Sequence, residues 1–394
     1  MFQKSYYSSR KIIFKYSIIY SIIFIVFYAI IPVVILSPVY PESSKLLSDL
    51  TIVSVITILI SSNITLPNNE SKYILGDFSN LINVTFFIFL LLVLITFITA
   101  PSIPIIESLK GASQSELSIH RENFLKNRSG WEIILGYLIE LFTQFFLPYL
   151  IAYSYYINHK NKKIYILFFS LFCVSFLAKS YFLKIFIPIF FIEYSKSKNK
   201  VNLIIKGAIL IFFLLFFMYF ISGNIGSEAT IENEFFSTLY TPNSIIESII
   251  WRSIVIPVIT AIDGMNLFIF DLNGKFLLGD TSSIIAFLKG NERINFERLV
   301  YQSQFGGSDT GNANCYYLVE SFVNFGILGV ITFSLFVGYI IKSFVKKNDT
   351  ALMGILPLFL FNLFNAGLIS LFFSGGFFIL FFFVKLFKFK NGQS

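Results

Sequence analysis

The chain has 394 residues, of which 56% are hydrophobic and only 13% are charged, and its formal net charge is +8. Soluble domains carry roughly 25% charged residues, so this composition, with a mean hydropathy of +0.76, excludes an ordinary soluble protein and a disordered chain. The two cysteines and two histidines argue against a disulfide framework and a His-based metal site. We therefore expect an all-α integral membrane protein that holds no metal.

A helix needs about 20 mostly apolar residues to cross a bilayer, and ten runs in this chain approach or exceed that length. Two of the runs are short, and they form either a tight pair of helices or one broken element (164–178 and 181–194). Together the ten runs predict a polytopic helix bundle, with residues 1–394 in a single membrane-embedded domain. The predicted spans are 16–36, 46–66, 81–100, 131–157, 164–178, 181–194, 202–222, 318–341, 350–368 and 371–388.

The distribution of basic residues predicts the orientation of these spans, because short cytoplasmic loops collect Lys and Arg. With the N-terminus inside, the inner segments hold 17 basic residues and the outer segments hold ten. Every short loop with a basic cluster then lies on the same side. A ten-span protein with both termini in the cytoplasm is therefore self-consistent.

This arrangement leaves two sizeable outer segments, near 101–130 and 223–315. The second contains an apolar stretch at 244–270, whose isoleucines recur at helical spacing while Glu247 and Arg252 can face water. If this stretch crossed the membrane, every downstream loop would change sides. We therefore expect an amphipathic or re-entrant segment against the outer leaflet, within the long outer loop at 223–315.

Arginine is scarce: of 30 basic residues, 24 are Lys and six are Arg. Lys has A/T-rich codons, as do the abundant Phe, Ile, Asn and Tyr, so a retained Arg points to a role that Lys cannot fill, such as bidentate binding of phosphate oxygens. Arginines on the outer side therefore predict a site for a lipid-linked phosphate or pyrophosphate. The alternative is that they form exposed ion pairs with nearby glutamates. Five of the six lie in the two outer segments: Arg121, Arg128, Arg252, Arg293 and Arg298.

Polar residues also gather just before and inside the eighth predicted span. Asp309 lies in a glycine-rich turn, and Asn312 and Asn314 follow it with amide groups that can bind substrate. Glu320 and Asn324 lie four residues apart, on one face of the span. An ionisable residue inside a membrane helix indicates a functional site by default. The alternative is a Glu320 that snorkels to the interface or pairs with an arginine.

The sequence GNANCYYLVESFVNFGILG, from Gly311 to Gly329, resembles bacterial O-antigen polymerases of the Wzy type. Members of that family often show G-x-A-N-x-N, an acidic residue, and then A-N-F-G-x-x-G. The chain departs from this pattern at Asn312 and Val323, and it lacks the R-x10-G signature of some members. The junction that holds Lys179 and Lys184 is similar to a Lys- or Arg-containing junction in the same family. The matching residues are Gly311, Ala313, Asn314, Glu320, Asn324, Phe325, Gly326 and Gly329.

The resemblance implies a polymerase of the bacterial inner membrane, acting at its outer face. Such enzymes transfer a growing glycan from undecaprenyl pyrophosphate to the non-reducing end of a new lipid-linked repeat unit. The activated lipid donor requires no cofactor, and no nucleotide-binding signature or nucleic-acid partner is expected. The implied partners are undecaprenyl-pyrophosphate-linked oligosaccharides, the bilayer, and a chain-length regulator and flippase of the same pathway.

Each candidate residue can be given a role in this reaction. Glu320 or Asp309 would be the catalytic base. The five outer arginines would bind pyrophosphate, and Arg252, Arg293 and Arg298 are preferred among them. Two other functions remain open: a flippase or transporter of the same pathway, and an O-antigen ligase with the same donor and a lipopolysaccharide acceptor. The remaining substrate-binding candidates are Asn312, Asn314, Asn324, Lys179 and Lys184.

Overall fold

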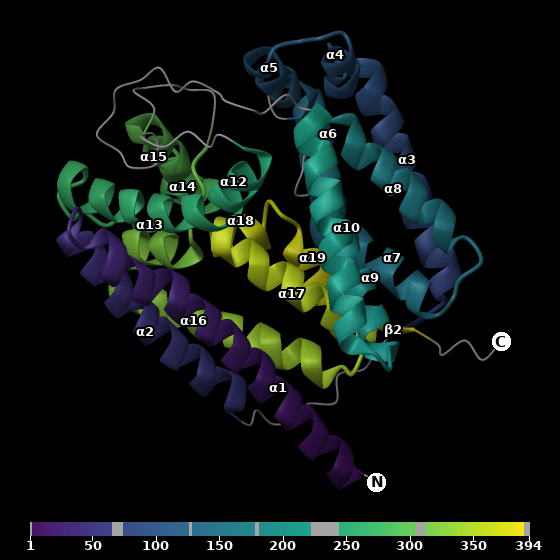
Figure 1. Ribbon diagram of the computed structural model, residues 1–394, viewed down its shortest axis with the longest axis horizontal. Coiled ribbons are helices and arrows are strands. Elements are labelled where there is room, and N and C mark those ends of the chain that lie inside the picture. The colour runs from purple at the N-terminus through teal and green to yellow at the C-terminus, as the bar shows by residue number, and fades with distance from the viewer. Residues whose placement is uncertain are drawn as a thin grey trace. The chain divides into compact units, whose positions relative to one another are not determined.

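The computed structural model shows an almost entirely helical chain (Figure 1). It divides into two compact units assembled from interleaved segments, and each unit is described by itself below. Unit 1 comprises 1–66, 226–349 and 360–370, and unit 2 comprises 67–225, 350–359 and 371–394. The predicted all-α class is confirmed. The structure describes residues 2–64, 74–125, 128–177, 181–221, 244–304 and 312–389.

Within the described residues, five helices are long and apolar enough to cross a membrane. They correspond to the first, second, third, fourth and eighth predicted spans, and the count of ten is not confirmed. The other five predicted ranges also contain helices, but four of these have only 10 to 16 residues. At 1.5 Å per residue, these four are too short for a hydrocarbon core of about 30 Å. The five spans are Lys15–Leu36, Pro41–Asn63, Phe78–Thr99, Glu132–Tyr156 and Tyr317–Lys346.

In unit 1, three long helices pack against one another: α1 (Phe2–Ile25), α2 (Pro41–Asn63) and α16 (Tyr317–Lys346). Helix α1 continues through two π-helical turns, η1 (Val26–Ile30) and η2 (Pro32–Leu36).

Small and hydroxylated residues line the contact between α2 and α16. Ser61 donates a hydrogen bond to the Leu335 carbonyl (2.6 Å), and Ser54 bonds the Tyr317 hydroxyl (2.5 Å). Beside Ser61, Gly338 lets the two backbones approach closely, as is typical of helices packed in membranes.

The segment expected to be amphipathic or re-entrant forms a helix with two π-helical sections: α12 (Ile245–Ile250), η4 (Trp251–Val255), α13 (Ile256–Asn266) and η5 (Leu267–Asp271). Its middle part is largely buried, because α13 packs against α2, α16 and α15 (Phe296–Gln304). The short helix α14 (Ser283–Lys289) precedes α15.

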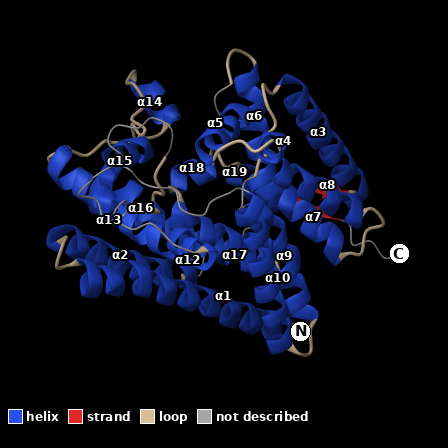
Figure 2. Cartoon of the chain, turned by 45° about the horizontal axis from the view of Figure 1, so that its top comes forward, coloured by secondary structure: helices blue, strands red, loops and turns tan. Residues whose placement is uncertain are grey.

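Unit 2 is a second bundle of helices with one small sheet, coloured red in Figure 2. Strand β1 (Ile74–Gly76) pairs in parallel with β2 (Phe387–Phe389), so the last predicted span ends earlier than expected. The 164–194 region forms two helices. The helices of this unit are α3 (Phe78–Thr99), α4 (Pro104–Leu109), α5 (Gln114–Leu125), α6 (Glu132–Leu141), η3 (Phe142–Phe146), α7 (Leu147–Tyr156), α8 (Lys162–Ser175), α9 (Tyr181–Lys196), α10 (Lys200–Ile221), the start of α17 (Thr350–Asn365), the end of α18 (Leu368–Phe372) and α19 (Phe377–Leu386).

The close approach of α2 and α16 yields a test of the packing in unit 1. A Cβ atom at Gly338 would lie 2.8 Å from the Ile58 carbonyl oxygen, so Gly338→Val forces the two helices apart. We expect a loss of about 1–3 kcal/mol of unfolding free energy, measured by thermal unfolding in detergent. Thr332→Ala, at an exposed position on the same helix, is the control. Equal stability of the two variants would contradict this packing.

Candidate functional site

Glu320 lies in the first turn of α16 and is almost fully buried. Its Oε2 atom accepts a hydrogen bond from the backbone N–H of Ile369 (3.2 Å). Gly367 faces the same carboxylate, and a Cβ atom at this position would overlap the Glu320 side chain. The segment 367–369 therefore packs directly against the carboxyl group and donates a hydrogen bond to it.

One turn further along, Asn324 connects α16 to the loop that precedes α14. Its Oδ1 atom accepts a hydrogen bond from the Gly279 N–H (2.9 Å), and its Nδ2 group donates to Thr281 Oγ1 (2.9 Å) and to the Glu320 carbonyl oxygen (2.7 Å). The side-chain amide is therefore occupied by protein groups on both ends. This geometry gives Asn324 a positioning role for the loop.

Helix α16 is interrupted at Gly326, whose φ of +62° and ψ of −151° are not helical. The interruption leaves carbonyl groups without intrahelical partners. Two of them are satisfied by the same loop, because Leu277 N–H donates to the Val323 oxygen and Leu278 N–H donates to the Asn324 oxygen, both at 3.0 Å. The NFG sequence thus forms a break whose polar groups the loop satisfies.

The loop is also cross-linked within itself by Asp280. One carboxylate oxygen forms an ion pair with Lys289 (2.5 Å) and the other accepts a hydrogen bond from Asn291 (2.8 Å). These hydrogen bonds hold the pKa of the Asp280 carboxyl below its ordinary value. The Asp280 backbone oxygen accepts from the Ile294 N–H (2.9 Å), which fixes the chain beside Arg293.

Arg293 and Glu320 are connected through Thr281. The Arg293 Nε atom donates to the Thr281 carbonyl oxygen (3.0 Å), while the Thr281 side chain bonds Asn324, one turn after Glu320. The Arg293 side chain is exposed. Glu297 and Arg293 are charged groups that act electrostatically on Glu320. The buried Glu320 carboxylate and the exposed Arg293 guanidinium are therefore linked through Thr281 and Asn324.

Next to this arrangement, a narrow recess lies between α13, α15 and the start of α16, and it is too small to hold a water molecule. Asn314 and Glu297 line it, and the Glu297 backbone oxygen accepts a hydrogen bond from the Ala313 N–H (3.0 Å). Cys315 also lines this recess, and its burial raises the pKa of its thiol. Asn312 and Arg298 are exposed.

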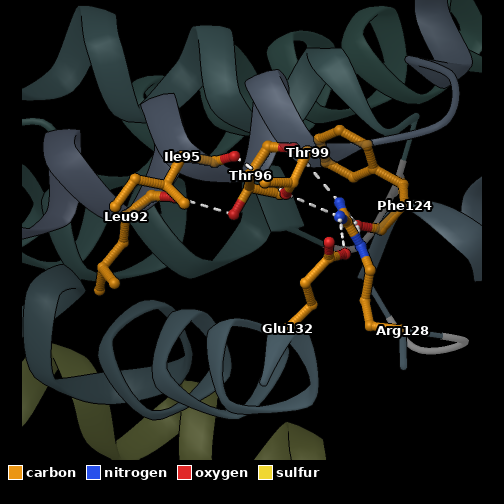
Figure 3. A network of polar contacts seen from close by, with 7 residues as sticks. All are labelled: Leu92, Ile95, Thr96, Thr99, Phe124, Arg128 and Glu132. Carbon is orange, nitrogen blue, oxygen red and sulfur yellow. Dashed lines mark hydrogen bonds and ion pairs between the residues drawn. The ribbon is translucent and has the colours of Figure 1, made fainter. Parts of the chain in front are cut away.

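The predicted pyrophosphate ligand Arg128 belongs to unit 2, where it is engaged by the protein (Figure 3). Its guanidinium makes five hydrogen bonds, two to the Phe124 carbonyl oxygen and one each to Thr96 O, Thr99 Oγ1 and Glu132 Oε2. Because a guanidinium has five N–H groups, this set uses its full donor capacity. Arg128 thus joins α3, α5 and α6.

The remaining candidates are scattered over the chain. Arg121 and Lys184 lie in unit 2: Arg121 Nε donates to the Leu117 carbonyl oxygen (3.1 Å), and Lys184 Nζ lies over the Tyr181 ring, 2.8 Å from its centroid. Arg252 lies in η4. Asp309 and Lys179 lie outside the described residues.

Two residues that shape the Glu320 surroundings were missed by sequence reasoning. Gly367 lies in a predicted span, and nothing in its neighbourhood distinguishes it from a packing glycine. Thr281 is an ordinary polar residue 43 positions before Asn324. Gly279 and Asn291, in the same part of the sequence, indicate turns but do not single out Thr281.

No family model, no curated protein and no solved structure matches this chain. The resemblance to Wzy-type polymerases therefore rests on residues 311–329 and remains a prediction.

The Arg128 contacts yield a test that separates a structural arginine from a ligand-binding one. Arg128→Lys replaces five N–H donors with three, and the lysine ammonium cannot reproduce the planar donor geometry of the guanidinium. We expect a loss of about 1.5–3 kcal/mol in the unfolding free energy, measured by thermal unfolding in detergent. Arg298→Lys, at an exposed position, should leave stability unchanged. A stable Arg128→Lys protein would contradict a structural role.

Proposed function

We propose that this protein is a membrane glycosyltransferase that polymerises lipid-linked oligosaccharide repeat units in the bacterial inner membrane. It transfers a growing glycan from undecaprenyl pyrophosphate to the non-reducing end of a new lipid-linked unit. The proposal combines the polymerase-like sequence of 311–329 with the five apolar helices of spanning length.

The observation that carries the proposal is the buried Glu320 carboxylate, on which the exposed Arg293 acts electrostatically. Burying a carboxylate in the first turn of an apolar helix costs free energy. A structural role alone would be met by an apolar side chain at lower cost. The carboxylate is supported by Ile369 N–H and by the small Gly367, so the chain accommodates it specifically.

Each group has a role in the transfer reaction. The acceptor hydroxyl oxygen attacks the anomeric carbon of the donor sugar and forms the new glycosidic bond. The bond from that carbon to the pyrophosphate oxygen breaks, and the electron pair leaves with pyrophosphate. Glu320 takes the hydroxyl proton, and Arg293, with Arg298, stabilises the negative charge that develops on the leaving group.

Asn324 and Arg128 receive other roles in this proposal. Asn324 positions the Thr281 segment, and Arg293 with it, through the hydrogen bonds described above. Arg128 is left out of the pyrophosphate site because protein acceptors use its donors. Arg252 remains a candidate for a second phosphate contact.

Deletion of the gene tests the proposed activity directly. We expect surface glycan of a single repeat length, because units are still made and exported but no longer joined. The measurement is the glycan length distribution on a gel, with the complemented strain as the control.

Other outcomes of the deletion identify the alternatives. Unchanged long chains would exclude the polymerase. Loss of all surface glycan, with repeat units retained in the cytoplasmic leaflet, would indicate a transporter. Long glycan that stays on its lipid carrier would indicate a ligase.

A substitution at Glu320 tests the proposed base. Glu320→Gln keeps the size of the side chain but removes the proton acceptor, so chain elongation in membrane vesicles should fall by about 10²–10⁴-fold. Glu292→Gln, at an exposed position beside Arg293, is the matched control and should elongate normally.

A second variant tests the support of the carboxylate without changing any charge. Gly367→Ala places a methyl group against Glu320 and should also slow elongation. For the first variant, normal elongation by a folded Glu320→Gln protein would exclude Glu320 as the base.

A further inference from the structure

We propose that α14 and the loop before it rest in the headgroup region of a lipid bilayer, with Phe287 and Leu288 inserted among the acyl chains. The proposal concerns how unit 1 meets the membrane on the side where α16 begins. It does not depend on the enzymatic activity proposed above.

The tip of this segment exposes large apolar side chains. Phe287 is 82% exposed and Leu288 is 77% exposed, while Ala286 on the same helix is buried. Leu278, in the preceding loop, is 60% exposed and Phe276 is also exposed. Scattered apolar residues are ordinary on a surface, but a contiguous group of this size marks a contact surface.

Hydrogen bonds fix the backbone of the loop beside the end of α14. Leu278 has a positive φ of +49°, a conformation that costs a non-glycine residue free energy. It is maintained by the Leu278 N–H bond to Asn324 and by Lys289 Nζ, which donates to the Leu278 carbonyl (3.3 Å) and pairs with Asp280. Lys289, at the end of α14, therefore holds this helix next to Leu278. The exposed Leu278 side chain has a fixed position as a result.

The apolar surface continues directly onto α16. A Cβ atom at Gly326 would lie 3.2 Å from the Phe276 ring, so the loop touches the helix at its break. The next two residues of α16 are exposed and apolar, Ile327 and Leu328, and Leu328 is 71% exposed. Since α16 has the length and composition of a membrane span, its exposed apolar side is the one that lipid covers. The α14 surface adjoins that side.

The charges around this surface favour lipid over a protein partner. Lys275 and Lys289 are exposed and flank the apolar residues in the sequence, and Arg293 follows after α14. Of the acidic residues in this stretch, Asp280 is paired with Lys289, which leaves the exposed Glu292. Basic residues beside exposed aromatic and aliphatic side chains are the pattern of segments that lie at a bilayer surface, with apolar groups about 5–10 Å into the headgroup and acyl boundary. The same placement would put Arg293 at the depth of lipid phosphates.

The experiment places a fluorescent side chain at the tip of α14 in the full-length protein. The two native tryptophans are first replaced, Trp131→Phe and Trp251→Phe, and thermal unfolding verifies that this background is folded. Phe287→Trp is then introduced, and the protein is reconstituted into phosphatidylcholine vesicles with phosphatidylglycerol. Emission is measured with phospholipid brominated near the carbonyl end of the acyl chain and, separately, with aqueous iodide. Glu292→Trp in the same background is the matched control.

We expect F287W to emit at shorter wavelength than E292W, to lose more intensity with brominated lipid, and to lose less with iodide. Equal iodide quenching of the two variants, without quenching by brominated lipid, would place α14 in water and overturn the proposal. Protection of F287W from both quenchers would also overturn it, because the residue would then be covered by protein, either a second copy or another partner.

Discussion

The break of α16 at Gly326 is the constraint on which the arrangement around Glu320 depends. A helix that stops hydrogen bonding to itself must find other partners for its backbone. Here the partners come from the loop at 277–281, and the Asn324 side chain adds hydrogen bonds to Gly279 and Thr281 at the same contact. The loop, α14 and Arg293 are therefore positioned by a defect in a membrane helix.

This constraint links two features that have different chemistry. On one side of the break, Glu320 is buried and supported by 367–369. On the other side, Ile327 and Leu328 expose apolar surface. A single helix thus changes from a polar, buried turn to an exposed apolar one within eight residues. A reaction between two lipid-linked substrates requires polar groups at such a boundary, since the reacting atoms are polar and the carriers are not.

The sequence predicted the helical class and the placement of Glu320 and Asn324 on one helical face, because these follow from hydropathy and from the helical period. It did not predict the role of Thr281 or Gly367. Their importance comes from contacts 43 and 47 residues away along the chain, and no local pattern marks such contacts. The arginines illustrate the same limit, because the sequence counted Arg128 among the five outer pyrophosphate ligands, although as a second choice. Only the contacts of Arg128 show that its guanidinium is occupied, whereas Arg293 and Arg298 are exposed.

The interleaving of the two units has a consequence for biosynthesis. Unit 1 receives its last segment at 360–370, and unit 2 receives its last at 371–394. Helix α17 contributes its first residues to one unit and its last residues to the other, and β2 completes a sheet that began with β1 more than 300 residues earlier. These segments are synthesised long after the helices that they complete, so neither unit can close until residues beyond 360 have been made. The early helices of each unit therefore lack part of their packing until then, and the two units are completed one directly after the other along the chain.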